Sequence, residues 1–396
     1  ILKESGYSTL YVGKWHLAGY DEFSNVGPFE RWPLGLGFER FYGFVGGETS
    51  QWFPHLAQDN QSIETPATPG YHLTEDLTDK AIKYIAEQKQ VNPDKPFFLN
   101  LAYGAAHAPL HAPRRFIDMY RGRFDKGWDK VREETLARQK AMGIVPQNTV
   151  LPPRNPEIKA WDELKPEEKK LYARFQEVFA GYLTHCDENI GRLMGFLKEI
   201  GAFENTVFVI VSDNGASQEG RLTGSYNYVR YFNQVPENDQ LTASYLDELG
   251  GPSTYPHYPM GWAMAGNTPF KMYKQNTHAG GNTDPLIIHW PKGIKDKGAI
   301  RSQYHHIIDV TPTILEIAGI KQPRQVNGVD QQPFDGQSMY YSIVEGTAPA
   351  RRSLQYYEML GHRGIYSKGW KALTLHKQGS SFDKDQWELY HVDEDF

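Results

Sequence analysis

The sequence has 396 residues, of which 39% are hydrophobic and 23% are charged, and its formal net charge is −6. This composition is ordinary for a soluble globular protein, and the charge gives no electrostatic reason to expect nucleic acid or an anionic membrane as a partner. The single cysteine, Cys186, excludes an intrachain disulfide. No run reaches the roughly 18 apolar residues of a membrane span, and nothing in the sequence indicates a cellular compartment.

Strand and helix patterns alternate along the first 320 residues. Apolar runs predict strands at 8–12, 96–103, 206–212 and 285–290, and the last three have few polar positions, as in strands buried on both faces. Apolar residues at helical spacing predict helices over 74–88, 167–200 and 307–320. Buried strands separated by helices indicate an α/β fold, a mostly parallel sheet with helices on both faces.

The organisation changes at about residue 321, where short β-type runs such as 363–366 and 387–390 begin. We therefore predict two domains: 1–320, and a smaller, mainly antiparallel α+β subdomain over 321–396. The Pro-rich segment 146–166 is interpreted as a surface excursion. Residues 219–268 show no period and are interpreted as a long loop over one end of the sheet. Both ends of the sequence interrupt a pattern, so we expect a longer protein with parts missing before Ile1 and after Phe396.

Asp213 and Asn214 follow the predicted strand 206–212. The carboxyl ends of parallel strands face the ligand crevice of an open sheet. Carboxylate and amide oxygens are hard ligands that suit Ca²⁺ or Mg²⁺, although two oxygens cannot fill a site that takes six to eight. The alternative is that Asp-Asn-Gly is only a turn.

Three further segments carry cationic or titratable side chains. Lys14 and His16 lie two residues apart after the strand 8–12, so in an extended chain they share one face. His107 follows the strand 96–103, and Lys274 precedes Gly280-Gly281, where glycines would let the backbone approach a small ligand. A cation beside a histidine can bind an anion, and the histidine can donate protons to it or accept protons from it. Each residue alone could equally be a surface lysine or a packed histidine.

The order of these segments resembles a known family. Gly-Lys-Trp-His-Leu at 13–17, Ala-x-His-x-Pro-Leu around His107, Ser-Asp-Asn-Gly at 212–215 and Lys274-x5-Gly-Gly resemble the active-site segments of type I sulfatases, in the alkaline-phosphatase-like superfamily. Segments 120–133 and 247–258 are similar to the bacterial arylsulfatase branch. Ala18 and Ala279 stand where the family has Gly and Glu.

The resemblance implies a chemistry. A formylglycine, made from Cys or Ser, is hydrated to a diol, attacks the sulfur of a sulfate ester and then eliminates sulfate. His16 would contact the diol and act as base, and Lys14 would stabilise it. His107 and Lys274 would hold sulfate oxygens and assist the leaving group. Asp213 and Asn214 would be two ligands of one Ca²⁺, with Mg²⁺ as the alternative.

The nucleophile motif of the family is absent from these 396 residues. The family needs Cys or Ser with Pro or Ala two residues later and Arg four later. Cys186 is followed by Asp-Glu-Asn-Ile and lies on the apolar stripe of the helix 167–200, so we interpret it as a core residue. Thr347-Ala-Pro-Ala-Arg351 has the spacing but not the residue type. We therefore expect the formylglycine in a missing N-terminal segment, and no activity from the sequence as printed.

The predicted function is a sulfuric ester hydrolase, similar to an arylsulfatase, with a small-molecule or carbohydrate sulfate ester as substrate. Nucleic acid is not expected as a partner, and neither is a membrane span. Two alternatives stay open: a phosphonate or phosphate ester hydrolase of the same superfamily, and a non-catalytic homologue that binds sulfated glycans.

Overall fold

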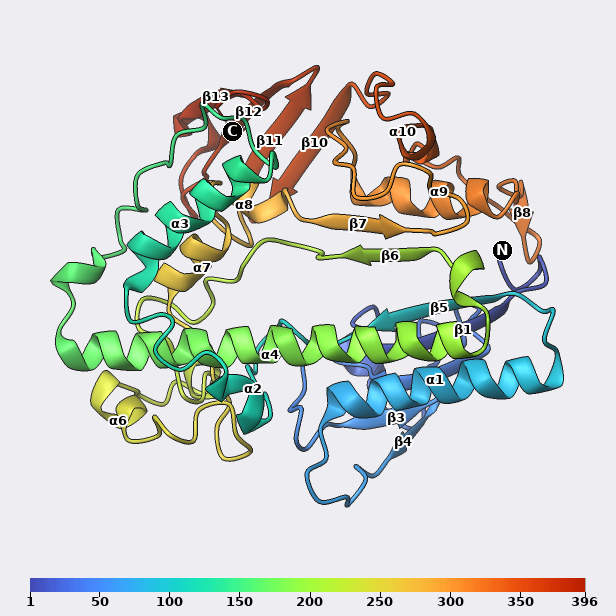
Figure 1. Ribbon diagram of the computed structural model, residues 1–396, viewed down its shortest axis with the longest axis horizontal. Coiled ribbons are helices and arrows are strands. Elements are labelled where there is room, and N and C mark those ends of the chain that lie inside the picture. Colours follow the sequence, from blue (N-terminus) through green and yellow to red (C-terminus); the bar gives the residue numbers. More distant parts are fainter. Residues whose placement is uncertain (396) are drawn as a thin grey trace. The chain divides into compact units, whose positions relative to one another are not determined.

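The computed structural model describes residues 1–395, which form two compact units (Figure 1). Each unit is discontinuous in sequence. Unit 1 consists of Ile1–Gly127, Glu163–Gly201 and Glu219–Met260, and unit 2 consists of Trp128–Asp162, Ala202–Gln218 and Gly261–Phe396. The predicted division after residue 320 stays a prediction.

Unit 1 contains a five-stranded sheet with the order β4-β3-β2-β1-β5. The strands are β1 (Ser8–Lys14), β2 (Arg40–Phe44), β3 (Leu56–Gln58), β4 (Gln61–Ile63) and β5 (Phe97–Ala102). β1 pairs in parallel with β2 and β5, whereas β2 with β3, and β3 with β4, are antiparallel. The sheet is therefore mixed, with its parallel part formed by three neighbouring strands whose carboxyl ends share one edge.

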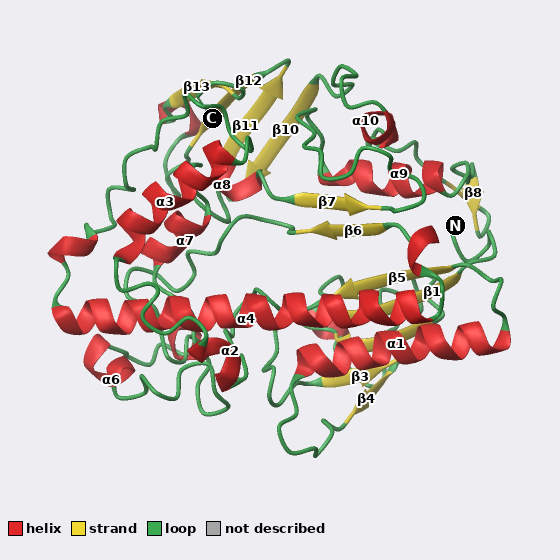
Figure 2. Cartoon of the chain, viewed as in Figure 1, coloured by secondary structure: helices red, strands yellow, loops and turns green. Residues whose placement is uncertain are grey.

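Two long helices pack in unit 1, α1 (Leu73–Val91) and α4 (Pro166–Glu199) (Figure 2). α1 contacts β1, β2 and β5 as well as α4. Its buried positions recur at helical spacing, with Leu77, Ala81 and Ile85 fully buried. α4 begins at a proline in the first turn, where a missing N–H costs nothing. Both helices match the sequence prediction, and Cys186 on α4 is buried as predicted.

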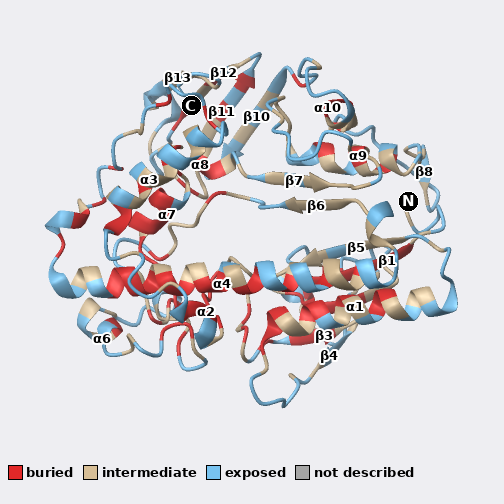
Figure 3. Cartoon of the chain, viewed as in Figure 1, coloured by how far each residue is buried: buried red, intermediate tan, exposed pale blue. Residues whose placement is uncertain are grey.

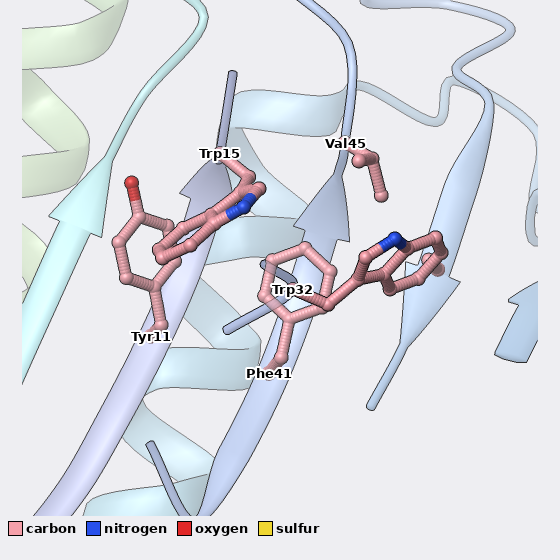
Figure 4. Packing of buried hydrophobic residues seen from close by; sticks show 6 residues of the cluster. Tyr11, Trp15, Trp32, Phe41 and Val45 are labelled. Carbon is pink, nitrogen blue, oxygen red and sulfur yellow. The ribbon is translucent and has the colours of Figure 1, made fainter. Parts of the chain in front are cut away.

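The opposite face of this sheet is covered by an irregular segment. Tyr11 and Phe41 point to this side and form a cluster with Trp15 and Trp32 (Figure 4). Tyr11 meets Trp15 edge to face at 4.9 Å between ring centroids. Trp32, only 2% exposed, donates its indole N–H to the Glu22 carbonyl, so its one polar group is satisfied inside the core. This cluster fixes the chain that follows β1.

Three short α-helices also lie in unit 1: α2 (Arg114–Asp118), α5 (Val229–Phe232) and α6 (Asp239–Ala243). The last two interrupt the predicted long loop 219–268, and α7 (Met260–Gly266) interrupts it near its end; the rest of the loop is irregular as expected. Within unit 1 this segment runs beside the chain after β5, because Leu110 N–H donates to the Pro256 carbonyl at 2.9 Å.

Unit 2 contains the antiparallel pair β6 (Phe208–Val211) and β7 (Leu286–His289), both at predicted strand positions. We expected these strands to be buried, but Val211 is 43% and Ile287 56% exposed (Figure 3). The helices of unit 2 are α3 (Gly127–Ala141), α7 (Met260–Gly266), α8 (Ala279–Asn282), α9 (Val310–Ile317) and α10 (Tyr340–Val344). α9 falls within the predicted helix 307–320.

The C-terminal part of unit 2 is a four-stranded antiparallel sheet, as predicted. Its strands are β10 (Leu354–Met359), β11 (His362–Ser367), β12 (Trp370–Thr374) and β13 (Trp387–His391), paired in that order, and a small hairpin of β8 (Gln325–Val326) and β9 (Val329–Asp330) precedes them. The fold class is thus α/β with a C-terminal antiparallel subdomain. None of the helices between residues 1 and 395 has the length and apolar content that a membrane crossing requires.

The Pro-rich segment 146–166 is mostly exposed, as predicted, but a few of its side chains are buried. Trp161 is 4% exposed and lies edge to face on Trp128, with the two ring centroids 4.8 Å apart. Trp262 of α7 lies 5.6 Å from Trp161 in the same cluster. Burial of these indole rings is favourable, so Trp161 anchors the otherwise exposed segment to unit 2.

Candidate active site

Lys14 and His16 extend from the end of β1. Gly13 and Gly43, which are paired across β1 and β2, allow the strands to approach closely at this point. A Cβ on Gly13 would lie 1.9 Å from the Ala102 carbonyl oxygen of β5, and the φ of Gly13 is +115°. No other residue fits there, so glycine at 13 sets the path of the chain into Lys14.

His16 leaves the strand with a φ of 53°, which is unusual for a residue with a side chain. Its N–H still bonds the Val45 carbonyl at 3.0 Å, so the backbone stays attached to the segment after β2. A Cβ on Gly47 would lie 2.7 Å from the His16 ring. The imidazole therefore packs over Gly47. Lys14 is half-buried and its carbonyl accepts the Tyr11 hydroxyl, whose pKa burial raises to about 12.

His107 follows β5 in a tight turn closed by its own N–H bond to the Gly104 carbonyl, at 3.0 Å. Its Nδ1 lies 2.8 Å from the Ala108 carbonyl oxygen and 3.9 Å from a carboxylate oxygen of Glu48. Because β1 and β5 are parallel neighbours, Lys14, His16 and His107 all lie at one edge of the sheet. The sequence placed these three residues at strand ends, and the structure brings them to the same edge.

In unit 2, Asp213 and Asn214 follow β6 and lie beside the loop that carries Lys274. The Lys274 N–H donates to the Ala216 carbonyl at 3.1 Å, and the Ala216 N–H donates to Asn267 Oδ1 at 2.9 Å. Asn214 donates its amide nitrogen to the Gly215 carbonyl at 3.0 Å. The structure therefore groups Lys274 with the Asp-Asn pair around one loop.

Gly280 and Gly281 permit close backbone packing inside unit 2. A Cβ on Gly280 would lie 2.2 Å from the Met272 carbonyl oxygen, and one on Gly281 would lie 2.1 Å from that of Asn276. A Cβ on Gly215 would in turn meet the Gly280 carbonyl at 1.8 Å. The glycines thus let α8 pack against both the Lys274 loop and the segment after Asn214. Within unit 2 they help to position the Lys274 loop, and the predicted approach of their backbone to a ligand stays a prediction.

Asp284 lies near Asp213, and the sequence analysis did not single it out. It directly precedes β7, which is the wrong end of a strand for a parallel sheet. Because β7 runs antiparallel to β6, with Val211 opposite Leu286, the start of β7 lies beside the end of β6. Burial, and to a smaller extent the neighbouring charge of Asp213, raises the pKa of the Asp284 carboxyl to about 7.

A cation beside these carboxylates would relieve that repulsion, and Asp213 and Asn214 have the oxygen ligands that Ca²⁺ prefers. The residue types therefore fit Ca²⁺, the ion that the resemblance implies, but these residues are too few to complete its coordination. Among residues 1–395, no three His, Cys, Asp or Glu side chains are grouped so that they could hold a metal. A Ca²⁺ at this place would need further ligands from other groups.

Comparisons with known proteins identify the family of this chain. The sulfatase family model matches residues 1–320, and a model described as N-sulphoglucosamine sulphohydrolase, C-terminal, matches residues 272–396. The chain belongs to the sulfatase family.

Individual relatives give the same assignment. An uncharacterized sulfatase of Schizosaccharomyces pombe is 32% identical over 421 residues, covering 100% of this chain and 71% of that protein. An arylsulfatase of Klebsiella aerogenes is 31% identical over 353 residues, covering 85% of this chain and 70% of the relative. The crystal structure of the putative sulfatase yidJ from Bacteroides fragilis superposes with a TM-score of 0.61 at 20% identity, covering 98% of this chain and 69% of that one. The chain thus spans about 70% of these three proteins.

Proposed function

We propose that the protein containing this chain is a sulfuric ester hydrolase of the arylsulfatase type, which uses a formylglycine nucleophile and one Ca²⁺. The observation that carries the proposal is the bond from Lys274 N–H to the Ala216 carbonyl, at 3.1 Å. It groups a cation with two hard metal ligands in the segments that match the sulfatase family.

The residues of this chain have separate tasks in the proposal. His107 and Lys274 bind the oxygens of the sulfate group and donate to the leaving oxygen as its bond to sulfur breaks. His16 takes a proton from the nucleophile, and Lys14 stabilises negative charge next to it. Donors and cations fixed in advance around developing charge are the strongest catalytic effect available to such a site. Asp213 and Asn214 would hold the Ca²⁺, which supplies further positive charge to the sulfate oxygens.

We propose that the nucleophile belongs to residues outside the printed sequence. Cys186 does not fill this role, because it is buried on α4 and burial raises the pKa of its thiol to about 12. The modification motif is also absent around it. The natural substrate in this proposal is an aryl or carbohydrate sulfate, and the match of residues 272–396 to an N-sulphoglucosamine sulphohydrolase C-terminal model supports a sulfated sugar.

Parallel assays of the complete protein with matched aryl sulfate and aryl phosphate esters test the proposal. We expect kcat/KM to be larger for the sulfate, and elemental analysis to find one calcium or magnesium per chain. Faster phosphate hydrolysis together with two bound zinc ions would indicate the phosphate ester hydrolase instead. Tight binding of a sulfated saccharide with no turnover, and no Cys or Ser at the nucleophile position, would indicate the non-catalytic homologue.

A further inference from the structure

Glu48 lies next to His107, and the sequence did not single it out. It follows β2 after Gly46-Gly47, at the same edge of the sheet as Lys14 and His107. One carboxylate oxygen lies 3.9 Å from His107 Nδ1, and the other accepts a hydrogen bond from the Tyr255 hydroxyl at 3.3 Å. The side chains of Glu48 and His107 are 30% and 28% exposed, so solvent screens this pair only in part.

The protein holds this arrangement by contacts on both sides. Gln51 N–H donates to His111 Nδ1 at 3.2 Å, and His111 Nε2 donates to the Thr254 carbonyl at 2.7 Å. This buried histidine therefore joins the segment after β2 to the long irregular segment. A Cβ on Gly104 would lie 2.5 Å from Gln51 Nε2, so the Gln51 side chain packs directly on the turn that precedes His107.

Tyr255 is equally well fixed. Its N–H donates to the Tyr226 carbonyl at 2.7 Å, and its carbonyl accepts from the Tyr228 N–H at 3.0 Å. Burial, and then the charge of Glu48, raises the pKa of the Tyr255 hydroxyl, so this group stays a neutral donor. Tyr255 therefore supports the carboxylate without competing for its charge.

The hydrogen bonds of His107 settle which nitrogen carries a proton. The Ala108 carbonyl, 2.8 Å from Nδ1, can only accept, so Nδ1 is protonated in either charge state of the ring. The nitrogen that changes with charge is thus Nε2. An opposite charge within about 4–6 Å favours the charged form of a titratable group, and Glu48 meets that condition.

We propose that Glu48 is a positioning residue that acts through His107, and that Tyr255 holds it in place. This inference rests on the proposed sulfatase function and adds a specific assignment to it. Glu48 keeps the imidazole protonated on both nitrogens, so that Nε2–H points its proton to the substrate. When the S–O bond breaks, its electron pair stays on the leaving oxygen, which takes the Nε2 proton. His107 is then neutral and retains its Nδ1 proton.

The test uses Glu48→Gln in the complete protein, with two aryl sulfates that differ in leaving-group basicity. A proton donor matters most when the leaving group is poor. We expect kcat to fall by about tenfold or more for the basic phenol and by less than about threefold for the acidic nitrophenol. Tyr255→Phe, which keeps the carboxylate but removes its support, should produce a smaller loss with the same leaving-group dependence, and Glu48→Asp should recover part of the loss.

Glu75→Gln is the matched control. Glu75 contacts the buried His185 at 2.9 Å elsewhere in unit 1, so its variant also loses a Glu–His pair. Its ratio between the two substrates should equal that of the wild type. An equal loss for both substrates in Glu48→Gln, or no loss, would overturn the assignment.

A spectroscopic measurement separates this proposal from the proposed function. Nitrogen-15 shifts of the His107 ring at one fixed pH should show a smaller doubly protonated fraction in Glu48→Gln than in the wild type. Unchanged shifts would refute the role of Glu48 even in an active enzyme. Wild-type protein without sulfate ester turnover would refute the function, whatever the shifts show.

Discussion

At the scale of single residues, the sequence indicated candidate site positions more readily than the residues that contact them. Lys14, His16, His107, Asp213, Asn214 and Lys274 were identified because they end predicted strands or match motifs. Glu48 and Asp284 were missed. The strand before Glu48 was not predicted, and Asp284 precedes its strand, where a parallel sheet would place no ligand. Neither position has a local signal, since each meets its titratable neighbour, His107 or Asp213, only in the folded chain.

Lys274→Ala should reduce turnover strongly without unfolding the protein. The substitution removes a cation aimed at the transferring group, and a loss of about 10²- to 10³-fold in kcat/KM is expected for such a contact. The backbone bond to Ala216 does not depend on the side chain, so the loop should persist. Lys297→Ala, at an exposed position of the same unit, serves as the control. Equal kinetics for the two variants would mean that Lys274 has been assigned wrongly.

Because His111 is buried, we expect the free energy of unfolding to decrease in mild acid. Burial lowers its pKa to about 4, from an ordinary value of 6.5. The unfolded state therefore takes up a proton first, so stability is full above pH 6.5 and is lost as the pH falls towards 4. The loss from this one group is roughly 3 kcal/mol.

His111→Gln tests that origin, because glutamine can accept and donate hydrogen bonds but does not titrate. Urea unfolding of the complete protein at pH 7 and pH 4.5 should show a smaller difference in the variant. An identical pH difference in both proteins would place the acid sensitivity elsewhere, for example at His72, whose pKa burial also lowers.

At the scale of elements, hydrophobic pattern predicted type and position well. The strands at 8–14, 97–102, 208–211 and 286–289 and the helices α1 and α4 all lie where apolar spacing indicated. The hydrophobic pattern did not predict strand direction, because an apolar run such as 286–289 looks the same in a parallel and in an antiparallel strand. It also missed α3, where few apolar residues mark a helical face, and the burial of Trp161, which depends on Trp128 and Trp262.

Gly13→Ala should disrupt the central strands. The new Cβ would lie 1.9 Å from the Ala102 carbonyl oxygen, and alanine would also have to adopt a φ of +115°. We expect a loss of stability on the order of 3 kcal/mol or more, because both a backbone clash and a strained conformation are introduced. Thermal or urea unfolding measures it.

Gly6→Ala separates the backbone clash from the conformational strain. Gly6 has a φ of +92°, but a Cβ there meets nothing within 4 Å. Its variant should therefore lose only the conformational part, about 1 kcal/mol. Similar losses at positions 6 and 13 would show that strand contact at Gly13 is not close.

At the scale of the whole molecule, each unit has a strand with apolar residues that pairs on one side only. Among the described strands, β5 is bonded only to β1 in unit 1, and β6 only to β7 in unit 2. Val211 of β6 is 43% exposed. Unpaired, apolar strand edges favour association with other chains. The sequence pattern had predicted burial for these strands because an apolar run gives the residue types of a strand but does not show which elements pack on it.

Residues 1–396 expressed alone should therefore bind a hydrophobic dye, associate on concentration and show no sulfate ester turnover. Dye binding and association would result from the exposed strands, and the lack of turnover would result from the absent Cys or Ser motif.

The control is the protein expressed from the longer reading frame. We propose that it adds a strand ending in two acidic residues and then Cys or Ser, with Pro or Ala two residues later and Arg four later. Those carboxylates would join Asp213 and Asn214 and approach the six to eight oxygens that Ca²⁺ takes. The longer protein should be monomeric, less dye-binding and active. A printed chain that unfolds cooperatively as a monomer and hydrolyses aryl sulfate would show that its nucleophile lies within residues 1–396, and the mechanism proposed above would then be wrong.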